Sequence, residues 1–281
     1  DVKSNKVDDT EGHGIYVSGS DNAEIKSNTV TDAEQHGILV NPSDDVEISW
    51  NYVEDVDWDG IHVDSGDDAY IHHNTVKDAG ADGIDVVDND GVRIHNNTVE
   101  DADDNGIEVS DSYDADIRWN YVTGSGDDGI NVEDSSYADI RNNEVRWSEN
   151  DGIDVNDSYK VDIVDNHVHG TYDGNGIEVS DSYDADITDN RVHYTDGDGI
   201  NVEDSFGADI RRNDIHDVDG NGIYVEDSNY ADVNDNDIED AGKNGIYINS
   251  SDNVDVVGND IEDTGDHGIK VNPSDFVNIF Y

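Results

Sequence analysis

The feature that most constrains the fold of this chain is a repeat of 23 residues. The dipeptide Gly-Ile recurs along the whole sequence, every 23 residues except for one step of 24 between Gly152 and Gly176. The glycines of this column are Gly14, Gly37, Gly60, Gly83, Gly106, Gly129, Gly152, Gly176, Gly199, Gly222, Gly245 and Gly268. A strict period of this length indicates an array of stacked units whose core grows unit by unit.

Each repeat holds three short runs in which apolar and polar residues alternate. Ile15 and Val17 flank Tyr16, residues 23–26 alternate in the same way, and Val30 lies between two threonines. A period of two indicates strands with one buried face, and such strands must pair with the next repeat about 4.8 Å away. The sequence therefore predicts an all-β fold. We expect a right-handed, single-stranded parallel β-helix of about 12 coils with three parallel sheets, forming one domain over residues 1–281.

A column of asparagines accompanies the glycines, where a column means the equivalent positions of successive coils. Its members are Asn28, Asn51, Asn74, Asn97, Asn120, Asn143, Asn166, Asn190, Asn213 and Asn236, with further asparagines at both ends. Asparagine tolerates the left-handed backbone conformation, so we expect it to form a one-residue corner. The side chains should also hydrogen-bond along the axis. The glycines should permit a tight turn into the next strand, and a serine column that includes Ser112 and Ser135 suits a polar turn.

The charge of the chain limits its partners. There are 71 Asp and Glu against 14 Lys and Arg, a formal net charge of −57. Phosphates would be repelled, so we expect no nucleic acid partner and no attraction to anionic membranes. No apolar run is long enough to predict direct insertion into a membrane. At molar salt the Debye length is roughly 3 Å, which quenches such self-repulsion and is typical of proteins from brine or a salt-rich cell.

The repeat resembles a known family. The patterns Asn-x-Val, Gly-Ile-x-Val and Ser-x-x-Ala-x-Ile are similar to the parallel β-helix repeat of the pectin-lyase-like superfold. They also resemble the NosD-type carbohydrate-binding and sugar-hydrolase repeats that are common in haloarchaeal surface proteins. The resemblance covers the whole chain. The resemblance implies the fold but is compatible with several functions, because the family includes lyases, hydrolases, epimerases, phage tailspikes, adhesins and a copper-maturation factor.

Enzyme motifs of this superfold are incomplete in the sequence. Gly12-His13-Gly14 resembles the Gly-His-Gly of polygalacturonases, but the motifs that should accompany it are missing, and the column of His13 exchanges His, Asp and Asn freely. We interpret that column as a polar corner. Arg118 and Arg141 lie two residues after Asp116 and Asp139 on the same outward face. We interpret them as a lattice of surface ion pairs, each contributing about 0–1 kcal/mol.

A column of aspartates is a candidate site for cations. Its members are Asp111, Asp134, Asp157, Asp181, Asp204 and Asp227. Neighbouring carboxylates about 5 Å apart repel by roughly 0.8 kcal/mol in bulk water and by more near protein. We therefore expect bound calcium or concentrated monovalent cations, although no cofactor is required.

Two further sets of residues are candidates for binding. His169, His193 and His216 fall on three successive coils with His167 close by, and stacked imidazoles could share zinc or copper. The alternative is that these histidines form a solvated stripe on the surface and bind no metal. Aromatic residues at one turn position, which could bind sugar rings or simply stack, are Tyr113, Tyr159, Tyr183 and Phe206.

The sequence favours a non-catalytic structural or adhesive rod at the surface of a halophile or on a virion, with surface glycans as partners. The coil length is nearly constant, with one extra residue near Tyr172, so little is available to wall a catalytic groove. We predict no catalytic residues and no turnover of acidic polysaccharides. The alternatives are a polysaccharide lyase, hydrolase or epimerase, and a NosD-type metal-handling protein.

The two ends predict head-to-tail self-association. The chain starts and stops in mid-coil without a visible cap, and Tyr281 falls in the column of Ser4. Parallel edges in register are templates for pairing with another copy. We expect Phe276, Phe280 and Tyr281 to be buried by a further coil or by a second chain.

Overall fold

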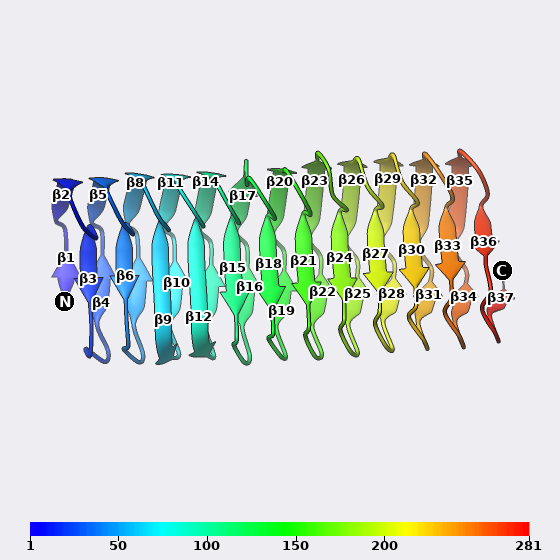
Figure 1. Ribbon diagram of the computed structural model, residues 1–281, viewed down its shortest axis with the longest axis horizontal. Coiled ribbons are helices and arrows are strands. Elements are labelled where there is room, and N and C mark those ends of the chain that lie inside the picture. Colours follow the sequence, from blue (N-terminus) through cyan, green and yellow to red (C-terminus); the bar gives the residue numbers. More distant parts are fainter. Residues whose placement is uncertain (281) are drawn as a thin grey trace. The chain divides into compact units, whose positions relative to one another are not determined.

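The computed structural model describes residues 1–280, and these residues form strands and turns without a helix. The chain forms two compact units, residues 1–139 (unit 1) and the residues from 140 onward (unit 2). In each unit, successive coils contribute parallel strands to three sheets, here called A, B and C in their order along the coil (Figure 1). The predicted fold class, a parallel β-helix with coils of about 23 residues, is confirmed. That both units form a single domain stays a prediction.

In unit 1 the three sheets have the same number of strands. Sheet A consists of β1 (Val2–Lys3), β4 (Glu24–Lys26), β7 (Glu47–Ser49), β10 (Tyr70–His72), β13 (Arg93–His95) and β16 (Asp116–Arg118). Sheet B consists of β2 (Lys6–Thr10), β5 (Thr29–Ala33), β8 (Tyr52–Val56), β11 (Thr75–Ala79), β14 (Thr98–Ala102) and β17 (Tyr121–Thr123). Sheet C consists of β3 (Ile15–Val17), β6 (Ile38–Val40), β9 (Ile61–Asp67), β12 (Ile84–Asp90), β15 (Ile107–Ser110) and β18 (Ile130–Glu133).

Unit 2 repeats this arrangement, and β19 (Asp139–Arg141) contains the boundary between the units. Sheet A consists of β22 (Asp162–Val164), β25 (Asp186–Thr188), β28 (Asp209–Arg211), β31 (Asp232–Asn234), β34 (Asp255–Val257) and β37 (Asn278–Phe280). Sheet B consists of β20 (Glu144–Ser148), β23 (His167–Thr171), β26 (Arg191–Thr195), β29 (Asp214–Val218), β32 (Asp237–Ala241) and β35 (Asp260–Thr264). Sheet C consists of β21 (Ile153–Asn156), β24 (Ile177–Ser180), β27 (Ile200–Glu203), β30 (Ile223–Glu226), β33 (Ile246–Asn249) and β36 (Ile269–Val271).

The core of each unit is built from the apolar columns that the alternation predicted. Ile15 and Val17 are buried while Tyr16 is 59% exposed. Val2 pairs with Ile25, which is fully buried. Because the register places like residues on one another, Ile stacks on Ile in coil after coil. Full burial of one such side chain contributes about 1.5–3 kcal/mol.

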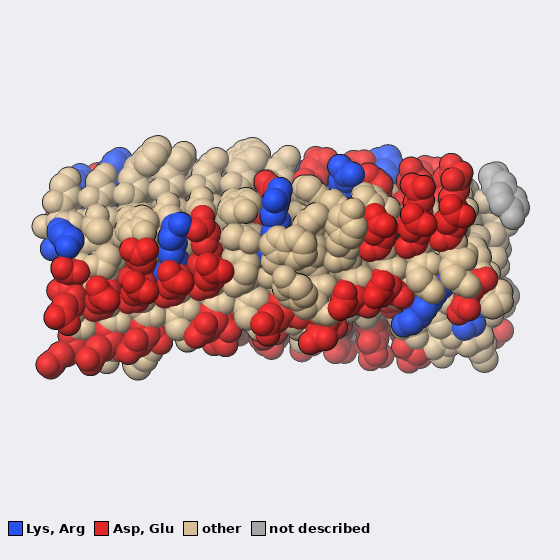
Figure 2. Space-filling model, turned by 90° about the horizontal axis from the view of Figure 1, so that it is seen from above, with Lys and Arg blue, Asp and Glu red and all other residues tan. Residues whose placement is uncertain are grey.

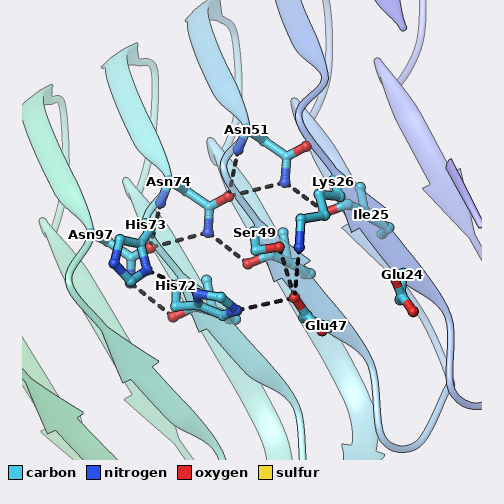
Figure 3. A network of polar contacts seen from close by, with 12 residues as sticks. Glu24, Ile25, Lys26, Glu47, Ser49, Asn51, His72, His73, Asn74 and Asn97 are labelled. Carbon is cyan, nitrogen blue, oxygen red and sulfur yellow. Dashed lines mark hydrogen bonds and ion pairs between the residues drawn. The ribbon is translucent and has the colours of Figure 1, made fainter. Parts of the chain in front are cut away.

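The asparagine column forms the predicted hydrogen-bonded ladder within each unit. In unit 1, Asn51 donates from its backbone N and from Nδ2 to Oδ1 of Asn74, at 2.9 and 3.0 Å (Figure 3). Nδ2 of Asn74 continues to Oδ1 of Asn97 at 3.0 Å. The predicted corner position is wrong by one residue. The left-handed residue is the one before each asparagine, for example Ser27 at a φ of 56° and His73 at 55°, because the amide itself must point inward to reach its partner.

Serine and glycine also take roles that differ in detail from expectation. The serine column makes a second ladder, in which the backbone N of Ser112 donates to Oγ of Ser135 at 3.1 Å. The glycines before isoleucine do not need a special backbone conformation, since Gly83 and its equivalents have no positive φ. Glycine is required for another reason: a Cβ on Gly83 would lie 2.6 Å from the carbonyl oxygen of Gly106.

The predicted ion-pair lattice is present on the outer face of sheet A. Nε of Arg118 lies 2.5 Å from Asp116, and Arg141 reaches Asp162 at 2.7 Å. In unit 2, Nε of Arg211 lies 2.7 Å from Asp209. These side chains are partly exposed, so each pair contributes little on its own.

Two other features of the sequence can be placed. The extra residue lies in the turn of residues 172–176, between β23 and β24. Phe276 and Phe280 are 77% and 61% exposed, and Tyr281 lies outside the described residues. Their burial by a second chain stays a prediction. Within residues 1–280 no helix has the length and apolar character needed to cross a membrane.

Candidate functional site

A histidine cluster occupies the outer face of sheet B in unit 2. The parallel register of β23, β26 and β29 places His169 beside His193 and His193 beside His216, as the sequence predicted. The nitrogens of His169 and His193 are joined by a nitrogen of His167, however, and not by one of His216. Nε2 of His193 lies 2.6 Å from Nε2 of His167 and 3.1 Å from Nδ1 of His169. His216 instead contacts Arg191, at 3.2 Å, while its ring centroid stays 4.8 Å from that of His193.

The electrostatics of this cluster favour neutral imidazoles. Burial, together with the neighbouring His169 and His167, lowers the pKa of His193 to about 3. Burial likewise lowers the pKa of His167 and of His169. Neutral imidazole is the form that binds zinc or copper. One nitrogen from each of His167, His169 and His193 lies within 4.8 Å of the others. Metal binding by His169, His193 and His216 stays a prediction, and His216 lies outside the group of nitrogens that are closest together.

Aromatic rings surround the histidine cluster. Trp147 meets His169 edge-on with ring centroids 4.8 Å apart, and Tyr194 meets it at 5.1 Å. The indole of Trp147 also covers Gly170, where a Cβ would approach the ring to 2.4 Å. Glycine at this left-handed position therefore makes room for the indole. Tyr172, next to the extra residue of the coil, lies stacked near Trp147 at 5.9 Å.

A shallow acidic groove adjoins the cluster on the side of Tyr194. Its volume is about 600 Å³. The acidic side chains that line it are Asp217, Asp219, Asp240 and Asp263. A groove of this charge repels anionic ligands.

The aromatic residues predicted to bind glycans lie at an exposed turn between sheets C and A. In unit 2, Tyr159, Tyr183 and Phe206 form successive parallel bridges. The ring of Phe206 lies 4.9 Å from that of Tyr230 on the next coil. We call these four residues the aromatic row, and they are between 37% and 58% exposed. Tyr113 belongs to unit 1, where its ring lies 5.0 Å from that of Tyr137.

The predicted column of aspartates lies just before these aromatic residues. All six aspartates are exposed and adopt the left-handed conformation, with φ between 46° and 50°. Aspartate is among the few residues that tolerate this conformation, so the column has a structural role at the corner. Figure 2 shows acidic side chains gathered in rows on the face that it presents. Cation binding by the column stays a prediction.

Salt is expected to change the stability of the protein strongly. With a net charge of −57, the melting temperature should be lowest at low salt with chelator present, and should rise with calcium or with molar sodium or potassium chloride. Thermal melting followed by circular dichroism, with and without chelator and at low and molar salt, measures this. The same melting temperature in all four conditions would show that the acidic columns need no counter-ions.

A buried cluster of His and Asp in unit 1 was not predicted. His36 and Asp59 belong to the corner column of His13, whereas His62 and Asp85 are at equivalent outward positions of sheet C. Nδ1 of His36 and Nδ1 of His62 lie 2.9 and 3.1 Å from the same oxygen of Asp59. Nδ1 of His62 also lies 2.5 Å from Asp85. Asp59 and Asp85 are only 6% and 8% exposed. The corner column is therefore more than a solvated polar corner.

The charges of this cluster are strongly coupled. Burial opposes ionisation of Asp59, but His36 and His62 outweigh it and hold the pKa of Asp59 well below its usual value. Burial also opposes protonation of His62, yet Asp59 and Asp85 raise the pKa of His62 to about 10. Asp82 has no such partner. Burial and the nearby Glu108 and Asp85 raise the pKa of Asp82 to about 8.

The corner column of unit 2 contains a buried aspartate whose replacement should stabilise the protein. Asp198 is 9% exposed, and its Oδ1 accepts hydrogen bonds from the backbone N and Nδ2 of Asn221. Burial raises the pKa of Asp198 above its ordinary value. An Asn side chain keeps the accepting oxygen without the charge, so we expect Asp198→Asn to stabilise the protein by about 1 kcal/mol at pH 7.

The pH dependence provides the check on this prediction. A carboxyl whose pKa is raised in the folded state favours folding below its unfolded pKa, and this contribution is lost as the pH rises through the folded pKa. The advantage of Asp198→Asn over the natural protein should therefore be largest at neutral pH and shrink towards pH 4 (about the pKa of an unfolded Asp). Urea unfolding at several pH values measures it. Asp240→Asn, at an exposed position, is the control and should show no comparable gain.

The comparisons with known proteins agree with the fold. No curated protein sequence matches the chain. Among solved structures, the Azotobacter vinelandii mannuronan C-5 epimerase AlgE4 A-module is 15% identical, with a TM-score of 0.62, covering 97% of this chain and 88% of the other. The Dettilon tailspike protein gp208 is 13% identical, with a TM-score of 0.65, covering 95% of this chain and 61% of the other. DFA-IIIase from Arthrobacter chlorophenolicus A6, in complex with GF2, is 13% identical, with a TM-score of 0.63 and coverages of 79% and 67%.

The family model identifies the repeat directly. The model described as "Right handed beta helix region" matches residues 1–145, 105–174 and 151–281, which together span the sequence. The structural neighbours have low sequence identity and show the fold alone. The chain therefore belongs to the right-handed β-helix family.

Proposed function

We propose that the chain is a non-catalytic structural and adhesive module that contacts neutral glycans through the aromatic row of unit 2. The observation that carries this proposal is the exposure of that row. Tyr183 and Phe206 are 58% and 43% exposed on neighbouring coils, although their apolar rings would gain from burial. Aromatic rings exposed side by side in this way are typical of a contact surface.

The chemistry around the row fits a neutral sugar chain. Coils repeat about 4.8 Å apart, so the rings offer a regular series of flat apolar surfaces to a regular polymer. Asp181 and Asp204, two residues before Tyr183 and Phe206, offer carboxylates that accept hydrogen bonds from sugar hydroxyls. The same carboxylates repel uronates and phosphates. The nearly constant coil length favours an open contact surface over an enclosed catalytic pocket.

The comparisons support the proposal at the level of the fold. A tailspike, an epimerase of a polysaccharide and DFA-IIIase share the β-helix with this chain. A place at the cell surface, outside the cell or on a virion, in a salt-rich environment, is part of the proposal. The charge of −57 is its support, because such a surface suits high salt.

The proposal is tested by glycan binding. Calorimetric titration in molar salt with neutral oligosaccharides of glucose and of N-acetylglucosamine should detect binding to the natural protein. The double variant Tyr183→Ala, Phe206→Ala should bind at least about tenfold more weakly, since losing 1.4 kcal/mol of contact energy weakens binding tenfold. Tyr16→Ala, which removes an exposed tyrosine from unit 1, is the matched control and should bind like the natural protein.

Two results would contradict the proposal. Equal binding by the natural protein and the double variant, or no binding to any of the sugars, would remove the aromatic row as a glycan site. Release of reducing ends or unsaturated products from neutral or acidic polysaccharides would instead favour the enzyme alternative, a lyase, hydrolase or epimerase on the same fold.

A further inference from the structure

The buried His-Asp cluster of unit 1 has more negative charge than its protein neighbours balance. Asp59, Asp82 and Asp85 each place one carboxylate oxygen within 4.8 Å of the other two, and none of them is more than 9% exposed. No Lys or Arg in residues 1–280 forms an ion pair with them, and the basic side chains that contact them are the imidazoles of His36 and His62. Buried carboxylates at this density either take up a proton or are stabilised by a further positive charge.

The directions of the polar groups also suggest a shared ligand. Nδ1 of His36 and Nδ1 of His62 approach one oxygen of Asp59, but neither makes a hydrogen bond of good geometry. Oδ1 of Asp85 is buried without a hydrogen-bond partner, on a residue that is 92% buried. The two ring nitrogens and the carboxylate of Asp59 therefore all lie within 4.8 Å of one another, with Asp85 beside His62.

We propose that unit 1 binds a divalent transition-metal ion of the zinc class at this cluster. The ligands are His36, Asp59 and His62, and the carboxylate of Asp85 lies beside His62. Imidazole nitrogens combined with carboxylate oxygens suit zinc and its first-row neighbours, whereas calcium and magnesium prefer oxygen ligands alone. The proposal is independent of glycan contact, which lies in unit 2.

The distances are close to those that such an ion needs. Zinc binds His nitrogen and Asp oxygen at about 2.0–2.2 Å, so two ligand atoms of a tetrahedral site lie about 3.4 Å apart. The separations of Asp59 from His36 and from His62 are 2.9 and 3.1 Å. Outward movements of a few tenths of an ångström would therefore admit the ion.

The surroundings hold the ligands in place. The second oxygen of Asp59 accepts a hydrogen bond from the backbone N of Asp82 at 3.2 Å, which fixes the orientation of the carboxylate. The ring of His36 stacks on His13 at 5.2 Å and meets Trp58 edge-on at 5.0 Å. These rings limit the access of water on one side.

The test is zinc titration of the full chain carrying His193→Ala, which disables the histidine cluster of unit 2. The protein is freed of metal with a chelator and titrated with ZnCl₂ in excess CaCl₂, so that exposed carboxylates are already occupied. We expect one tightly bound zinc ion per chain. Adding Asp59→Asn or His62→Ala should weaken its binding by about 100-fold or more, whereas Asp57→Asn, an exposed carboxylate nearby, should leave it unchanged.

A second readout identifies the ligands. Co²⁺ bound in place of zinc should show the visible absorption of four-coordinate cobalt, and this signal should be lost in Asp59→Asn. If His62→Ala fails to fold, Asp59→Asn decides alone, because the Asn oxygen can keep the contact with the backbone N of Asp82. Absence of tight zinc binding, or equal binding by Asp57→Asn and Asp59→Asn, would overturn the proposal and leave the cluster as an ion-pair network.

Discussion

Replacing Gly83 by alanine is expected to lower the free energy of unfolding by about 3 kcal/mol. A Cβ at this position would lie 2.2 Å from Cγ1 of Val99 and 2.6 Å from the carbonyl oxygen of Gly106. Both atoms belong to the next coil. The carbonyl cannot move away without disturbing the ladder between β12 and β15, where Ile84 pairs with Ile107. Overpacking of this kind forces a shift of the backbone rather than of one side chain.

Gly12→Ala is the matched control for this prediction. Gly12 lies in unit 1, has no positive φ and has nothing within 4 Å of the added Cβ. Thermal and urea unfolding should therefore show a clear loss for Gly83→Ala and almost none for Gly12→Ala. If both variants unfolded alike, close approach of the coils would not be the reason for glycine in this column.

The fold could be predicted from the sequence because a single physical constraint repeats in every coil. Alternation with a period of two fixes which side chains face the core, and Ile15, Val17 and Tyr16 lie as it requires. The turn chemistry was less predictable. Asparagine is suited both to a left-handed corner and to a buried ladder, and the sequence does not say which property is used. The structure uses the ladder, and His73 rather than Asn74 takes the left-handed conformation.

The sites were less predictable than the fold. His169 and His193 were expected together because they share a column, and the structure confirms their pairing. His167 was not assigned as their closest partner, because it lies two residues before His169 and therefore in a different column. Its contact with His193 joins residues that are 26 apart in the sequence, rather than equivalent positions of successive coils. The cluster of His36, Asp59 and His62 was missed for the same reason, because His62 lies in a different column from His36 and Asp59. Reading a column for its composition alone showed an exchange of His and Asp, whereas comparing adjacent columns would have shown acids facing histidines.

Replacing Asn74 by alanine is expected to have the largest effect of the substitutions considered, about 4 kcal/mol of destabilisation. Asn74 is 1% exposed. Its Oδ1 accepts from the backbone N and Nδ2 of Asn51, and its Nδ2 donates to the carbonyl of Ile48 at 2.8 Å and to Asn97 at 3.0 Å. Alanine would leave the backbone N and Nδ2 of Asn51 without this acceptor and would remove the bonds to Ile48 and Asn97, and each buried donor without a partner costs about 1–3 kcal/mol.

Unfolding in urea, followed by circular dichroism in molar salt, measures this loss. Asn41→Ala is the control, because Asn41 is half-buried and its side chain makes one hydrogen bond, to Asp64. Its cost should stay near 1 kcal/mol.

Asn74→Asp separates shape from hydrogen bonding: it keeps an accepting oxygen for Asn51 but cannot donate to Ile48, and it adds a buried charge. We expect Asn74→Asp to be as harmful as alanine at pH 7 and less harmful near pH 4, where the carboxyl can take up a proton. Nearly equal stabilities of Asn74→Ala and Asn41→Ala would show that the ladder contributes little and that apolar stacking alone holds the coils together.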